Sequence, residues 1–107
     1  MSGSFGELGS LLKQAQQMQR ELDRARAELK DRTVEGSAAG GAVRVLVTGD
    51  LQVDRVELLP ELVEAGDRQR IEELVTTAVR DGLERAHKLR NETLGKVTGG
   101  IELPGTL

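Results

Sequence analysis

The chain has 107 residues, a formal net charge of −3, no cysteine and a single aromatic residue, Phe5. Such a chain forms one domain with a thin core made of Leu, Val, Ile, Ala and Met. The lack of cysteine excludes disulfides and thiolate metal sites and fits a reducing compartment, so we expect a cytoplasmic protein. No segment approaches the roughly 20 apolar residues of a membrane span, and residues 1–10 lack a secretory pattern, so we expect no membrane association.

The first expected element is a long helix from Leu8 to Asp31. Its apolar residues recur at alternating spacings of three and four: Leu8, Leu11, Ala15, Met18, Leu22, Ala25 and Leu29. This heptad seam predicts an apolar stripe that faces another helix. The helix would be roughly 36 Å long, whereas a compact domain of this size has a radius of gyration of about 13 Å. Part of the helix must therefore project or lie along a partner, and the sequence leaves open whether the seam packs within the chain or on another subunit.

Three short strands follow the first helix. Alternating apolar residues indicate strands at Thr33 to Gly36, Ala42 to Thr48 and Val53 to Leu58. The links at residues 37–41 and 49–50 are short and rich in turn residues, so we expect an antiparallel meander. The apolar phase changes along the third strand, which predicts a bulge near Asp54.

A second long helix is expected after a connector at residues 61–66. Asp67 is its expected N-cap, and Gly95 and then Gly99-Gly100 are expected to end it. Its apolar face comprises Ile71, Leu74, Val75, Ala78, Val79, Gly82, Leu83, Ala86 and Leu89. The predicted fold is therefore α+β: a long N-terminal helix, a three-stranded antiparallel meander and a long C-terminal helix. Residues 1–107 form a single domain, with residues 1–7 and 101–107 expected to be flexible.

No catalytic, metal or cofactor site is apparent. The only histidine, His87, lies among Arg85, Lys88 and Arg90 without an acid placed to orient it. The glycine-rich residues 37–41 lack the following Lys-Ser or Lys-Thr of a phosphate-binding loop and are expected to link two strands. We therefore expect neither an enzyme nor a binder of small-molecule substrates.

Positive charge is concentrated near the two ends of the chain. Residues 11–32 carry six basic and four acidic residues, and residues 80–96 carry five and three, whereas residues 50–73 carry eight acidic and three basic residues. If the two helices lie together, their basic residues would line a surface that contacts phosphates. The alternative is that these charges serve solubility and pairing along each helix.

Several segments in the same order resemble the YbaB/EbfC family of nucleoid-associated proteins. They are residues 12–19 (LKQAQQMQ), 34–36 (VEG), 40–41 (GG), 43–45 (VRV), 56–58 (VEL) with Pro60, the helix from Ile71 through Ala78, 95–100 (GKVTGG) and 103–104 (LP). The resemblance covers nearly the whole chain. It implies an intertwined homodimer in which two small sheets and the second helices form a shared body, with helical arms that protrude like tweezers.

The resemblance also implies a function without catalysis. Members of this family bind double-stranded DNA with little sequence preference, in the cytoplasm, where they organise the bacterial chromosome and sometimes regulate transcription. The candidate DNA contacts are Lys13, Arg20, Arg24, Arg85, Lys88, Arg90 and Lys96. The candidate dimer interface is Val43, Val45, Val47, Ile71, Leu74, Val75, Ala78 and Val79.

A protein-interaction adaptor is the competing hypothesis. In that case the helical arms clasp an acidic or helical protein partner, and association with DNA is incidental. The two hypotheses differ in whether partners remain bound after nuclease treatment.

Overall fold

The computed structural model describes the backbone of residues 2–99 and the side chains of residues 6–99. In chain order the elements are α1 (Ser2–Lys30), β1 (Thr33–Ala38), the 3-10 turn η1 (Ala39–Gly41), β2 (Val43–Thr48), β3 (Val53–Leu58), α2 (Pro60–Glu64) and α3 (Arg68–Val97). The predicted α+β order is confirmed. The expected connector after β3 instead contains the short helix α2, because Pro60 at the start of a helix has no N–H to leave unpaired.

The ends of the two long helices differ from those expected. Helix α1 begins at Ser2 rather than at Leu8, and the predicted tail at residues 101–107 lies outside the described residues. Asp67 caps α3 as predicted, since its Oδ1 accepts a hydrogen bond of 3.1 Å from the Arg70 N–H. Of the glycines expected to end α3, Gly95 lies inside the helix, because a single glycine there costs only about 1 kcal/mol. The helix ends at Val97, and Gly99, with a φ of +68°, follows its C-cap Thr98 as predicted.

The sheet has the predicted antiparallel order β1-β2-β3. Leu46 pairs with Arg55, but the next residue, Val47, pairs with Val53. Asp54 is therefore left without a partner on β2. This is the bulge that the phase change predicted.

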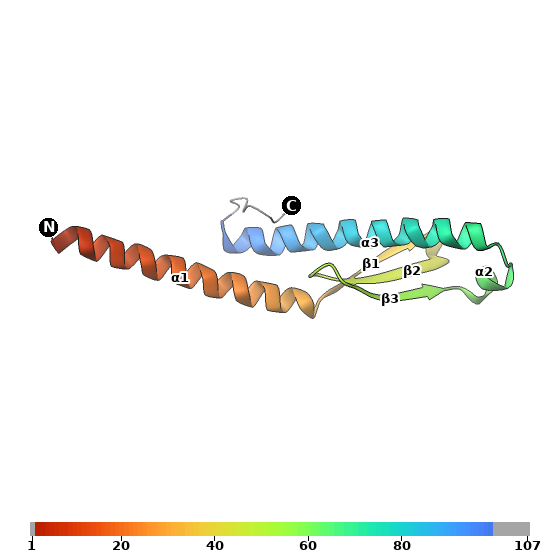
Figure 1. The fold of residues 1–107 in the computed structure, drawn as a ribbon, viewed down its shortest axis with the longest axis horizontal. Helices are drawn as coiled ribbons and strands as arrows, with labels where there is room; N and C mark the ends of the chain where they lie inside the picture. Colours follow the sequence, from red (N-terminus) through yellow and green to blue (C-terminus); the bar gives the residue numbers. More distant parts are fainter. Residues whose placement is uncertain (1, 100–107) are drawn as a thin grey trace.

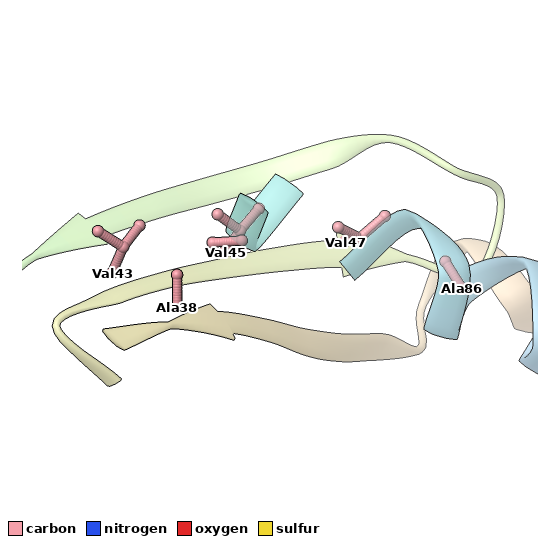
Figure 2. Close-up of a cluster of buried hydrophobic side chains, with 6 residues drawn as sticks. Ala38, Val43, Val45, Val47 and Ala86 are labelled. Atoms are coloured by element: carbon pink, nitrogen blue, oxygen red, sulfur yellow. The ribbon is translucent and has the colours of Figure 1, made fainter. Parts of the chain in front are cut away.

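One face of the sheet packs against α3. Val43, Val45 and Val47 point from β2 into this layer and have no exposed surface (Figure 2). On the helix side the buried positions are small residues, Ala78, Gly82 and Ala86. Small side chains let the helix approach closely, and α3 lies across β1 and β2 rather than over β3.

The second buried cluster joins α1 to the end of α3. Leu22, Ala25 and Leu29 pack with Leu94 of α3, and all four are buried. Helix α3 ends beside this contact, and the N-terminal half of α1 continues past it (Figure 1). The molecule measures 77 × 20 × 16 Å, with a radius of gyration of 20.5 Å instead of the about 13 Å of a compact domain.

The heptad seam therefore has two environments. Its C-terminal half packs on α3 of the same chain, whereas Leu8 and Leu11 are 63% and 62% exposed. Every side chain from Gly6 to Glu21 is exposed. We call this segment, residues 6–21, the free arm.

Candidate nucleic-acid interface

The structure places the predicted basic residues in several parts of α1 and α3. Lys13 and Arg20 lie on the free arm, two helical turns apart. Helix periodicity puts both on the side of α1 opposite Leu11 and Met18. The free arm thus has an apolar side and a basic side.

Arg24 and Lys96 lie together in a groove between α1 and α3. Arg24 lies on the α1 wall and Lys96 on the α3 wall, and Arg32 lines the same groove. Glu21 and Glu28 are its acidic members. The groove has three cations against two acids and is open to solvent, so a phosphate can reach its cations.

Arg90 lies on the other side of the α1–α3 contact. It shares a second groove with Arg26 and Lys30 of α1, and Asp50 from the turn between β2 and β3 is the only acid among its lining residues. Arg26 also contacts the Asp23 carboxylate at 3.6 Å. Three cations therefore meet one acid along this groove.

Arg85 and Lys88 lie further along α3, away from the other candidates. They share a hollow with Asp81 and Glu84, so acids and bases balance there. Arg85 Nε lies 3.2 Å from Asp81 Oδ1. The same Asp81 carboxylate accepts a 3.0 Å hydrogen bond from the Ser37 N–H, and this bond and then Arg85 hold the pKa of Asp81 below its ordinary value. Asp81 thus ties α3 to β1, and Arg85 is engaged in an ion pair with it.

Six basic residues line the two grooves that flank the α1–α3 contact. Three of them, Arg26, Lys30 and Arg32, were not among the predicted DNA contacts. Marking α1 residues by their angle from the seam would have placed Arg26 and Lys30 on one flank and Arg24 on the other. What the sequence did not contain was the position of the α3 end beside them.

The model of the YbaB/EbfC DNA-binding family matches residues 5–101 of the chain. The chain belongs to the YbaB/EbfC DNA-binding family. The resemblance noted from the sequence is therefore confirmed. This family is defined by DNA binding and is not a family of enzymes.

Relatives of this YbaB/EbfC member are named nucleoid-associated proteins. It is 39% identical over 104 residues to a nucleoid-associated protein of Acetivibrio thermocellus, covering 96% of this chain and 92% of the relative. It is 40% identical over 105 residues to a nucleoid-associated protein of Bacillus thuringiensis, covering 98% and 96%. The crystal structure of an uncharacterized protein from Helicobacter pylori superposes with a TM-score of 0.72 at 23% identity, covering 89% of this chain and 97% of that one. This match supports the fold.

The predicted dimer residues of this YbaB/EbfC chain fall into two groups. Val43, Val45, Val47 and Ala78 have no exposed surface within one chain. The other four retain exposed surface on α3: Ile71, Leu74, Val75 and Val79. Only the second group is accessible to a partner without moving α3 away from the sheet.

The described part of this YbaB/EbfC chain has neither a cluster of metal-ligating side chains nor a membrane-spanning helix. Residues 6–99 contain no cluster of three or more His, Cys, Asp or Glu side chains arranged to hold a metal ion. Of the helices within residues 2–99, none combines the length and apolar character needed to cross a membrane.

Proposed function

We propose that this YbaB/EbfC chain binds double-stranded DNA as a homodimer with little sequence preference, organises the bacterial chromosome in the cytoplasm and modulates transcription where it binds. The observation that carries the proposal is the cluster of basic side chains on both flanks of the α1–α3 contact. These residues are Arg24, Arg32 and Lys96 on one flank and Arg26, Lys30 and Arg90 on the other. We call them the junction cations.

The junction cations suit phosphate binding because they come from two rigid helices held by one buried contact. Arg and Lys that neutralise phosphates release condensed counterions, which supplies affinity independent of sequence. Contacts to phosphates fix position but carry no sequence information, so low specificity follows. Lys13 and Arg20 extend the basic surface along the free arm, whereas Arg85 is already engaged by Asp81.

Dimerisation is supported by an apolar strip that one chain leaves uncovered. Leu58, Val56 and Val53 of β3 pair with the buried valines of β2 and therefore lie on the same face of the sheet. Because α3 does not extend over β3, Val53 and Val56 are 48% and 44% exposed. This strip, together with Ile71, Leu74, Val75 and Val79 of α3, borders the core formed by Val43, Val45, Val47 and Ala78. We propose that a second chain covers it.

A titration of random-sequence duplex at increasing salt tests DNA binding. The double variant Arg24→Gln/Lys96→Gln removes two cations from each chain, so it should reduce the slope of log K against log salt by about 2 for each chain that contacts DNA, or about 4 for the homodimer. Lys30→Gln/Arg90→Gln tests the other flank in the same way. The matched control is Arg68→Gln/Arg70→Gln, which removes the same charge from the far end of α3. Equal losses in junction and control variants would show that only net charge matters, and absent or salt-independent binding by the native protein would refute the proposal.

The dimer is tested by Val56→Asp. Its side chain is largely exposed in one chain, so the variant should fold and yet be monomeric by light scattering. Arg55→Asp places the same charge on the opposite face of β3 and should remain dimeric. Val79→Asp should also give monomer or aggregate. A folded Val56→Asp dimer as stable as the native one would rule out this interface.

Nuclease treatment separates this function from a protein-interaction adaptor. The native protein purified from cells should lose its high-molecular-weight partners when DNA is digested. Protein partners that persist after digestion would favour the adaptor.

A further inference from the structure

We propose that the apolar side of the free arm binds the same segment of a second copy in antiparallel orientation, and that this contact links two homodimers. This inference rests on the proposed function in two respects: the existence of the homodimer, and the effect that linked homodimers would have on DNA. The contact between arms itself requires neither DNA nor another protein, so it can be measured with the purified protein alone.

The first observation is that the uncovered seam continues a covered one. Leu22, Ala25 and Leu29 show that this stripe packs on a helix, and the same spacing continues through Leu11 and Met18. Within the described part of the chain this stripe is not buried along the free arm, where Leu11 is 62% and Met18 40% exposed. A contiguous exposed apolar stripe marks an interaction surface, and a helical stripe fits another helix.

The second observation is that the stripe is complementary to itself when one copy is reversed. In an antiparallel pair, Leu8 of one copy meets Met18 of the other, and Leu11 meets Ala15. The small Ala15 then lies opposite the larger Leu11 in both central layers, whereas a parallel pair would set Ala15 against Ala15 and leave that layer underfilled. Leu12, which lies beside the seam and is 59% exposed, meets its own symmetry mate across the twofold axis.

Charge on the free arm is compatible with this pairing. Near the twofold axis the flanking residue is the neutral Gln14, which faces Gln14 of the other copy. Lys13 and Arg20 lie on the opposite side of the helix and remain free for phosphates. Glu7 and Glu21 face each other only at the two ends, so added salt should not weaken the pairing although it weakens DNA binding.

The contact is small and is therefore weak for one pair of arms. The free seam from Leu8 to Met18 extends over about 15 Å of helix, well short of a standard interface of about 1,600 Å². A homodimer has two arms, and dimers bound along DNA are close together, so effective concentration strengthens the contact. Linked homodimers would hold two DNA segments or neighbouring sites on one segment.

Thiol cross-linking tests both the contact and its direction, because the native chain has no cysteine. Leu8→Cys and Met18→Cys proteins, one of them tagged, are treated with a short bismaleimide separately and as a mixture. The mixture should give the mixed Leu8–Met18 product in clear excess over either self-linked product. Gln16→Cys, whose side chain points away from the seam, is the control for random collision.

A charge-neutral variant tests the association itself. Leu11→Gln/Met18→Gln changes two exposed side chains, so folding and the homodimer should be unaffected. By sedimentation velocity the native protein should form pairs of homodimers as its concentration rises, and the variant should associate at least tenfold more weakly. Gln16→Ala/Gln17→Ala is the matched control on the same helix and should behave like the native protein.

The outcomes decide between occupants. Self-linking of Leu8→Cys alone would establish a parallel pair and overturn the orientation. Cross-linking no greater than that of Gln16→Cys, or equal assembly by the native protein and Leu11→Gln/Met18→Gln, would overturn the contact and leave the arm to a different protein or to DNA. Failure of DNA binding with intact cross-linking would refute the proposed function and not this inference.

Discussion

The two halves of α1 carry the same apolar spacing and have opposite environments. Leu29 in the C-terminal half is 1% exposed, whereas Leu11 in the free arm is 62% exposed. The difference arises because α3 ends at Val97, beside the C-terminal half of α1, and does not extend along the free arm. Apolar periodicity thus specifies a helix and the direction of its stripe, but the length of a neighbouring element decides how much of that stripe is covered.

The body depends on close backbone approach, whereas the free arm does not. A Cβ on Gly36 would overlap the backbone of α3 at Ala78 and Gly82, and one on Gly9 would meet nothing within 4 Å. Gly36→Ala should therefore cost at least about 3 kcal/mol or prevent folding. Gly9→Ala should stabilise the helix by up to about 1 kcal/mol. Chemical denaturation of both proteins measures the contrast, and a harmless Gly36→Ala would contradict the β1–α3 packing.

The next largest contrast lies between two leucines of the seam. Leu29→Ala removes a fully buried side chain and should lower the free energy of unfolding by about 2–4 kcal/mol. Leu11→Ala should change it by less than about 0.5 kcal/mol at dilute concentration. Urea titrations at one low protein concentration give both values. Equal losses in the free energy of unfolding would mean that Leu11 is as well buried as Leu29.

Asp81, in the body of the molecule, should make the stability of the fold depend on pH. The hydrogen bond from the Ser37 N–H, and then Arg85, lower the pKa of this carboxyl below its ordinary value of 3.8. The folded state therefore binds this proton more weakly, so the carboxylate stabilises the fold above pH 3.8 and loses this contribution as pH falls through the folded pKa. Asp81→Asn should be less stable than the native protein at neutral pH, and the difference in Tm should shrink in acid. A difference that is constant with pH would exclude the charged carboxylate as the cause.

The smallest effect is expected at the link between β1 and β2. Ala39 has a φ of +52°, in the left-handed region that glycine adopts without strain. Ala39→Gly should raise the free energy of unfolding by about 0.5–1 kcal/mol, since relief of strain exceeds the added chain entropy. Thermal denaturation measures the gain. A loss of stability would show that Ala39 is not strained in solution.

The sequence predicted local features better than contacts between distant segments. The Asp67 cap and the bulge at Asp54 follow from neighbouring residues, so both were predictable. The coverage of the seam and the grouping of Arg24, Arg32 and Lys96 in one groove depend on how far α3 runs back along α1. Gly95 illustrates the reason: its cost to a helix is small, and the helix continues through it to bring Lys96 into the groove.

The dimer residues show the same limit. The alternation of Val43, Val45 and Val47 predicted one apolar face of β2, and the structure buries that face under α3 of its own chain. The same face continues onto β3 and remains exposed there. The sequence of β3 does not predict this, because coverage depends on the width of the sheet relative to one helix.

Hydrogen exchange along α1 tests the central contrast most directly. In dilute homodimer, amides of residues 22–30 should exchange slowly and those of residues 6–21 quickly, since only the first group lies in a helix held by buried contacts. Raising the protein concentration should slow exchange in residues 6–21 alone. Equal protection along the whole of α1 in dilute protein, or exchange of residues 6–21 that is independent of concentration, would contradict this account.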